Sequence, residues 1–110
     1  MTNFKIKNFK IKGAFCLEPK VFEDQRGFFY ESFNIKELKE NVKIDYDFVQ
    51  DNHSFSYKNV LRGLHFQTQN PQGKLIRVIS GEIYDVFVDL RLNSPTFQKW
   101  DSIILSSENR

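Results

Sequence analysis

The sequence lacks several features that would place it in a specialised class of proteins. It has a single cysteine, Cys16, so no disulfide can form within the chain, which agrees with a reducing compartment. No apolar run approaches the roughly 18 residues that span a bilayer, and the N-terminus alternates apolar and basic residues where a signal peptide would be continuously apolar. The formal net charge is only +2, too small to favour nucleic acid or an anionic membrane as a partner. We therefore expect a cytoplasmic protein that binds neither nucleic acid nor membrane.

The composition is that of an ordinary globular chain. With 110 residues, the length matches one domain, which we place at residues 1–110. Hydrophobic residues make up 40% and charged residues 27%, and apolar residues recur throughout, which excludes a disordered chain. Twelve phenylalanines are a heavy aromatic load, so we expect a core or an interface that buries them.

Short strands bounded by turn residues account for most of the chain. Residues 3–12 hold two alternating apolar runs whose phase slips at Lys7 and Asn8, which suggests a bulge or bend between two short strands. Strands about every ten residues, without a long helix, indicate an all-β antiparallel sandwich or barrel. The further strand candidates are residues 14–18, 28–33, 47–52, 60–67, 73–80, 82–91 and 100–105, and residues 23–27 carry the turn chemistry before the second of them.

One short helix is expected after residue 34. Asn34 is a good N-cap, and Glu37 follows three residues later, as in a capping box. Ile35 and Leu38 then fall on one face, and Asn41 is placed to end the helix. The expected helix has about two turns.

Residues 82–91 combine an apolar face with periodic acidic residues. Asp85 and Asp89 fall among apolar residues on one face of the expected strand, a pattern that suits a barrel lining around a polar ligand. A structural role stays equally open, with these carboxylates paired to Arg77 or Arg91.

Polar residues also gather in the segment RGLH. Arg62 and His65 are three apart, so a regular strand would send them to opposite faces. A bulge or kink at Gly63 would instead bring both into one cavity. The chain has only two histidines and no H-x-H pair, so we predict no metal site.

Six segments of the chain, taken in order, resemble the dTDP-4-dehydrorhamnose 3,5-epimerase family. This resemblance implies a cupin-type jelly roll, a homodimer, and catalysis without a metal or organic cofactor. It also implies inversion of C3 and C5 of dTDP-4-dehydro-6-deoxy-D-glucose to give dTDP-4-dehydro-L-rhamnose. The segments are RGFFYESFN, FVQDNHS, VLRGLHFQ, QGKLIRVISGEIYDVFVDLR, SPTF and LSSENR, which span about residues 14–110.

The resemblance also implies roles for individual residues. His65 matches the catalytic base, and Lys74 matches the lysine at the developing oxyanion. Asp85 is similar to a polar position near the base. Positions that hold the nucleotide diphosphate sugar match Arg26, Glu31, Gln50, Asn52 and Arg62. In the family, the segment that carries Arg26 and Glu31 reaches into the site of the neighbouring subunit.

Family chains continue beyond the SENR motif, and none of Tyr30, Tyr46, Tyr57 and Tyr84 matches the tyrosine acid. We therefore expect a partial domain that lacks its C-terminal part, and an isolated 110-residue chain with little or no activity. Two alternatives stay open: a related keto-sugar cupin, such as a 3-epimerase or 3,4-ketoisomerase, and a non-catalytic fragment that binds the sugar nucleotide. No residue distinguishes thymine from uracil.

Overall fold

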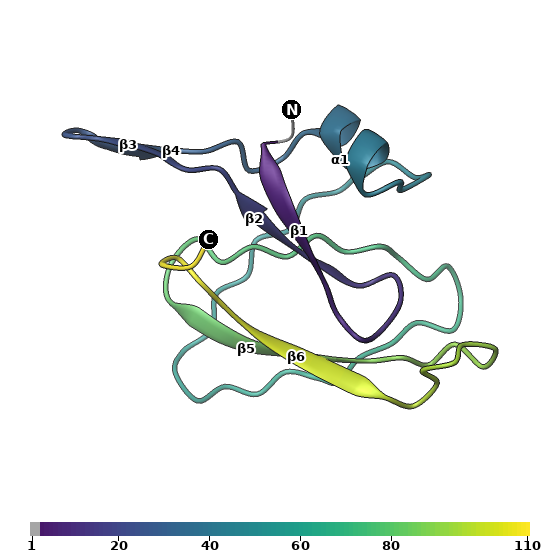
Figure 1. Ribbon diagram of the computed structural model, residues 1–110. Helices are drawn as coiled ribbons and strands as arrows, with labels where there is room; N and C mark the ends of the chain where they lie inside the picture. Colours follow the sequence, from purple (N-terminus) through teal and green to yellow (C-terminus); the bar gives the residue numbers. More distant parts are fainter. Residues whose placement is uncertain (1–2) are drawn as a thin grey trace.

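The computed structural model describes residues 3–110, and these form six strands and one short helix (Figure 1). The strands pair into three antiparallel two-stranded ribbons, β1–β2, β3–β4 and β5–β6. The elements are β1 (Phe4–Asn8), β2 (Phe15–Pro19), β3 (Phe22–Asp24), β4 (Gly27–Phe29), α1 (Ile35–Asn41), β5 (Glu82–Val88) and β6 (Trp100–Ser106). The predicted class, mostly strands with one short helix, is confirmed.

The first ribbon ends where the apolar alternation slips. β1 pairs with β2 up to Asn8, opposite Phe15, and the chain then turns through residues 9–13. The predicted second strand within residues 3–12 is therefore wrong, because Phe9 and Ala14 close a backbone turn in its place. Ile11 in this turn is 5% exposed and belongs to the core. Phe9 meets Phe87 of β5 edge to face at 5.0 Å, which joins the first ribbon to the third.

β3 and β4 form an arm that projects from the rest of the molecule (Figure 1). Its turn ends at Gly27, whose φ of 137° is accessible to glycine, as the turn chemistry predicted. The strand predicted at 28–33 stops at Phe29, because β3 offers no partner beyond Phe22. The guanidinium of Arg110 lies 4.0 Å from the centre of the Phe28 ring and braces the arm against the end of β6.

α1 begins and ends as the sequence predicted. The Asn34 side chain accepts hydrogen bonds from the backbone N–H groups of Lys36 (3.1 Å) and Glu37 (3.3 Å), which satisfies two of the free donors of the first turn. Glu37 does not complete a reciprocal capping box, since its carboxylate accepts from the Asn41 side chain. Leu38, 5% exposed, is the buried residue of the helix.

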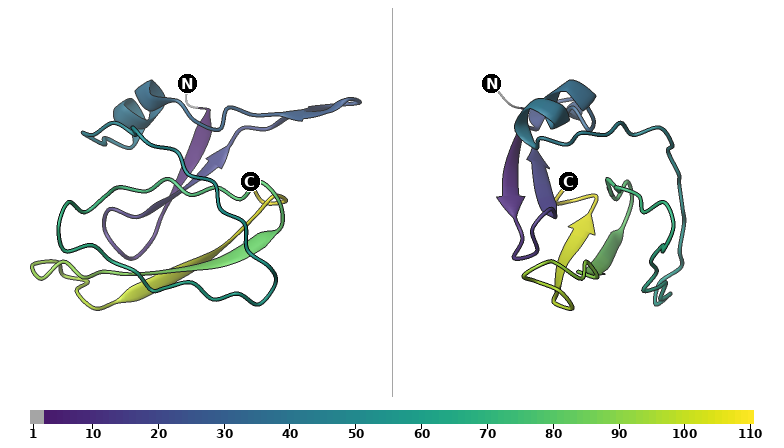
Figure 2. Two further views of the ribbon diagram at one scale, coloured as in Figure 1. Left: turned by 180° about the vertical axis from the view of Figure 1, so that it is seen from behind. Right: turned by 90° about the vertical axis from the view of Figure 1, so that its right-hand side faces the viewer.

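The long segment between α1 and β5 contains neither helix nor paired strand (Figure 1). The predicted strands at 47–52, 60–67 and 73–80 are therefore wrong for the described residues. Apolar alternation favours an extended backbone, but a strand also needs the N–H and C=O groups of a neighbour. Residues 3–110 supply no such neighbour to these segments. In the side view of Figure 2, this segment lies across the β5–β6 ribbon from β1 and β2.

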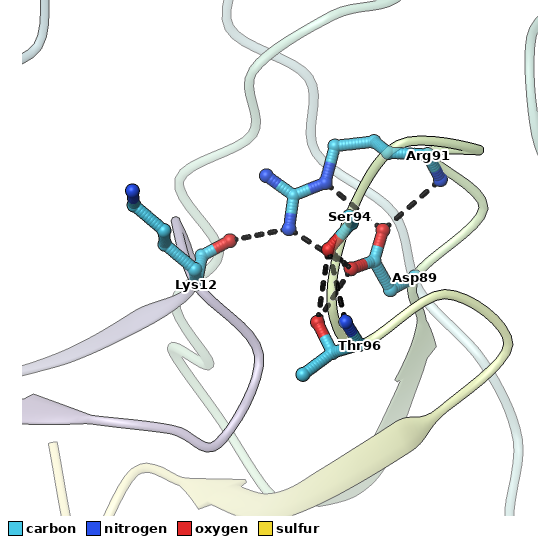
Figure 3. A network of polar contacts seen from close by, with 5 residues as sticks. All are labelled: Lys12, Asp89, Arg91, Ser94 and Thr96. Carbon is cyan, nitrogen blue, oxygen red and sulfur yellow. Dashed lines mark hydrogen bonds and ion pairs between the residues drawn. The ribbon is translucent and has the colours of Figure 1, made fainter.

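A polar network closes the turn that follows β5 (Figure 3). Asp89, 3% exposed, accepts from the Arg91 side chain at 2.9 and 3.0 Å, from the Ser94 hydroxyl at 2.5 Å and from the Thr96 hydroxyl at 2.7 Å. Arg91 also donates to the backbone carbonyl of Lys12 at 2.6 Å, so the network ties this turn to the β1–β2 turn. The structural alternative for Asp89 is thus confirmed, and β5 ends before it.

The described chain is more open than a closed domain of its length. Its accessible surface is 9754 Å², whereas a monomer of this mass exposes about 6,400 Å². The radius of gyration is 15.4 Å, against about 13 Å for a compact chain of 110 residues. Among the described residues, Ile11 and Leu38 are the buried hydrophobic side chains, so much apolar surface stays open to solvent. No helix in this part of the chain is long and apolar enough to cross a membrane.

Candidate active site

The predicted kink in the RGLH segment is present. Gly63 adopts a φ of 98°, and the His65 imidazole folds back so that Nδ1 lies 3.6 Å from where a β-carbon on Gly63 would be. The Arg62 guanidinium donates to the Ser56 hydroxyl (2.9 Å) and to the Phe55 carbonyl (3.1 Å). Two hollows lie along residues 8–15 and 22–29, and neither is lined by Arg62 or His65, so a cavity shared by these two residues stays a prediction.

Lys74 and Asp85 come from different segments and interact electrostatically. Asp85 lies on β5 and is half-buried. Burial raises the pKa of the Asp85 carboxyl, and the positive charge of Lys74 partly offsets that rise. Asp85 forms no ion pair with Arg77 or Arg91 among residues 3–110. The pattern on residues 82–91 thus divides into Asp89, which hydrogen bonds hold in a turn, and Asp85, a half-buried carboxylate whose pKa burial raises.

Tyr46 contacts the segment that carries Lys74, although no sequence motif marks it as a site residue. Its ring packs against Gly73, immediately before Lys74. A β-carbon on Gly73 would lie 2.6 Å from the Tyr46 hydroxyl oxygen and 2.7 Å from ring atoms Cε2 and Cζ. The glycine of the QGK motif indicates that another group approaches the backbone closely, but it does not reveal which distant side chain does so.

Gln50 and Asn52 lie side by side. The Gln50 side-chain amide donates to the Asn52 side-chain carbonyl at 3.1 Å. Two residues apart on an extended backbone, they point to the same side, as the period of two predicts. Both are exposed, so their remaining hydrogen-bonding groups are free to meet a polar ligand.

Arg26 lies in the turn between β3 and β4, and Glu31 follows β4 where the arm joins the rest of the chain. Arg26 forms an ion pair with Asp24 at 2.6 Å, and its hydrogen bonds lower the pKa of the Asp24 carboxyl. Glu31 accepts from the side chains of Asn3 and Asn34, both at 3.3 Å, so the N-cap of α1 also holds this carboxylate. Among residues 3–110, no hydrogen bond or ion pair joins either residue to His65 or Lys74, nor His65 to Lys74.

No group of three or more His, Cys, Asp or Glu side chains is placed to hold a metal ion in the described part of the chain. His53, the second histidine, lies in the exposed irregular segment after Asn52.

Comparison with known proteins points to one family for the chain. The sequence profile of the dTDP-4-dehydrorhamnose 3,5-epimerases matches residues 8–110. The chain belongs to this family. The epimerase of Methanothermobacter thermautotrophicus is 52% identical over 110 residues, and that of Salmonella typhimurium is 55% identical over 101 residues. These alignments cover 100% and 91% of the chain but 59% and 55% of the two relatives, so the chain spans little more than half of their length.

Solved structures of epimerases share the fold. The dTDP-6-deoxy-D-glucose-3,5-epimerase of Legionella pneumophila, in complex with dTDP-4-keto-L-rhamnose, superposes with a TM-score of 0.93 at 53% identity over 97% of this chain and 57% of that one. The Bacillus anthracis family member, with TDP and PPi bound, superposes with a TM-score of 0.89 at 48% identity over 96% and 61%. The fold is therefore the cupin type of these epimerases, as the resemblance implied.

Proposed function

We propose that this chain is the N-terminal part of an epimerase domain that acts on a nucleotide-linked keto sugar. The reaction inverts C3 and C5 of dTDP-4-dehydro-6-deoxy-D-glucose and yields dTDP-4-dehydro-L-rhamnose. The observation that carries this proposal is the superposition, with a TM-score of 0.93, on an epimerase in complex with dTDP-4-keto-L-rhamnose. Two features support a larger domain: the chain spans 55–59% of its relatives, and it leaves much apolar surface exposed.

Epimerisation next to a ketone begins with removal of a proton from carbon. The electrons of the broken C–H bond form a carbon–carbon double bond, and the carbonyl electrons move to the oxygen, which becomes an enolate. In the proposed mechanism, the His65 imidazole accepts this proton, because imidazole is the side chain suited to proton transfer near neutral pH. Return of a proton to the opposite face of the carbon inverts it, and the sequence is repeated at the second carbon.

Lys74 stabilises the enolate in this proposal. Its ammonium supplies a positive charge and hydrogen-bond donors to the C4 oxygen as negative charge develops there. Loss of one such donor typically raises the barrier by about 2.7–4 kcal/mol. Asp85 is a half-buried carboxylate on β5 whose pKa burial raises and the charge of Lys74 partly lowers, which supports a role beside the reacting groups.

The nucleotide diphosphate is held by side chains around this centre. Arg62 offers a planar guanidinium, which suits two-point contact with phosphate oxygens. Gln50 and Asn52 present amides on one side of the chain. In the proposed homodimer, Arg26 and Glu31 reach the site of the second subunit. The projecting arm supports this proposal, since Arg26 lies near its tip with its side chain 85% exposed.

We also place the enzyme in the cytoplasm, where a single free cysteine stays reduced. A related outcome, such as 3-epimerisation alone, would use the same enolate chemistry. The fold is shared by NovW of Streptomyces spheroides, a 4-keto-6-deoxy sugar epimerase that is 26% identical and superposes with a TM-score of 0.79. The two outcomes differ in whether the proton at C5 is exchanged.

The test is hydrogen exchange from the substrate in D₂O, followed by NMR with the complete protein. We expect deuterium at C3 and C5 and the L-rhamno product. His65→Ala should lower the exchange rate by about 100-fold or more, the lower range for a general base. His53→Ala, the matched histidine control, should keep the rate within about twofold. Wild-type exchange by His65→Ala would refute the assignment of the base, and binding of dTDP without exchange would refute the epimerase activity.

The partial-domain proposal has its own test. A protein that ends at Arg110 should show little or no exchange under the conditions in which the complete protein turns over. Robust turnover by that shorter protein would refute the proposal that the active domain extends further.

A further inference from the structure

We propose that Tyr46 is a positioning residue for Lys74, because its ring packs on Gly73 and fixes the backbone from which the Lys74 side chain starts. The proposal rests on the proposed function in one respect: it takes Lys74 as the group that stabilises the enolate. The contact itself is independent of that role.

Gly73 is a glycine because of a close approach. Its φ lies outside the left-handed region, so its backbone conformation does not demand glycine. The lack of space around Gly73 is what demands glycine. A β-carbon there would lie 2.6 Å from the Tyr46 hydroxyl oxygen and 2.7 Å from Cζ, closer than real β-carbon contacts. The ring is the far end of a side chain that is 44% exposed, so the contacts that hold it decide how far it yields to a β-carbon.

Tyr46 is held from two directions. Its ring meets Phe48 edge to face at 5.6 Å, and Phe48 meets Phe33 edge to face at 6.0 Å, so three rings run from the arm side of α1 to Gly73. Between Tyr46 and Phe48, Asp47 forms an ion pair with Lys39 of α1 at 2.6 Å. The ion pair ties the segment of Tyr46 to α1, and the rings tie it to Phe33, which directly precedes the helix N-cap Asn34.

The placement of Lys74 starts at its backbone, which follows the residue against which Tyr46 packs. An oxyanion stabiliser must hold its donors where charge develops, and a displacement of about 1 Å can cost 100-fold in rate. Tyr46 fixes the backbone just before Lys74, and Gly73 permits this contact because it has no side chain.

The test compares four variants of the complete protein by deuterium exchange and by dTDP binding. We expect Tyr46→Ala and Gly73→Ala each to lower the exchange rate by about tenfold or more while dTDP affinity stays within about twofold, because Lys74 acts on the transition state. Tyr46→Phe keeps the ring and should keep exchange within about twofold. The double variant, Tyr46→Ala with Gly73→Ala, should be no slower than Tyr46→Ala, because the added methyl then meets no ring.

A second measurement reports on Lys74 without activity. Lysines are dimethylated with ¹³C, which keeps their charge, and the Lys74 NMR signal is assigned by its loss in Lys74→Arg. The signal should move in Tyr46→Ala and Gly73→Ala and stay in place in Tyr46→Phe. Tyr57→Ala is the matched control, because Tyr57 also meets a phenylalanine edge to face, Phe55 at 5.2 Å, and should leave the signal in place.

An unmoved Lys74 signal with wild-type exchange in Tyr46→Ala would overturn the inference. So would equal losses in Tyr46→Phe and Tyr46→Ala, which would assign the effect to the hydroxyl. A wild-type protein without exchange would refute the proposed function, and the Lys74 signal would still decide whether Tyr46 places this lysine.

Discussion

Replacing Leu38 with alanine tests how this open chain is held together. Leu38 is 5% exposed, and Ile11 is its counterpart at the same exposure at the far end of β1. The helix that carries Leu38 also carries Lys39, which pairs with Asp47, and follows Asn34, which bonds Glu31. Loss of the Leu38 side chain therefore loosens the element from which two site segments are held.

The size of the effect follows from the atoms removed. Leucine to alanine deletes three carbon groups, worth about 0.8 kcal/mol each in transfer, or about 2.4 kcal/mol in total. A rigid cavity would add to this, and measured losses reach about 5 kcal/mol. The neighbours Ile35, Glu37 and Asn41 are only half-buried, so the site is free to collapse. We expect a loss of about 2–3 kcal/mol in the free energy of unfolding, near the low end of that range.

The assay is urea unfolding of the complete protein, followed by circular dichroism. Lys36→Ala is the control on the same helix, because its side chain is 81% exposed and its ion pair with Glu40 spans 4.0 Å; it should leave the unfolding midpoint unchanged. A loss below about 1 kcal/mol for Leu38→Ala would refute the claim that this side chain closes a core.

Two further predictions concern local polar contacts. Asn34→Ala should lower the free energy of unfolding by about 1 kcal/mol, because the helix loses its N-cap. Asn34→Ser keeps a hydrogen-bond acceptor and should retain most of this stability. Equal losses for the two variants in urea unfolding would contradict the capping role of Asn34. Hydrogen bonds from Arg91, Ser94 and Thr96 hold the pKa of Asp89 far below its ordinary value of 3.8. The stability from Asp89 is thus present above about pH 4 and lost as pH falls toward the lowered pKa, so Asp89→Asn should cost most at neutral pH and progressively less below pH 4 in thermal scans. A pH-independent difference would show that the charge is not the cause.

Much of the fold was predictable where contacts are local. The cap of α1, the Gly27 turn and the Asp89–Arg91 pair join residues at most three apart, so the geometry of a few dihedral angles decides them. The strands at β2, β5 and β6 were also predicted, because their apolar alternation coincides with a hydrogen-bonding partner.

The candidate site was predictable in its residue types but only partly in its placement. Motifs predict His65, Lys74 and the nucleotide-binding positions, and their roles stay predictions. The kink at Gly63 was predicted because Arg62 and His65, three residues apart, would otherwise point to opposite faces. The motifs did not reveal Tyr46, because nothing near it in the chain requires a contact with Gly73.

From its order of residues alone, the chain specified its family, its mostly β character, its helix boundaries and its tight turns, since each depends on motifs or on neighbours a few positions apart. Tertiary structure alone decided that residues 47–80 run without a strand partner among residues 3–110, that Arg91 bonds the backbone carbonyl of Lys12, and that a tyrosine ring lies on Gly73. Such contacts close long loops, so their formation depends on the packing of the whole chain and leaves no local trace in the sequence.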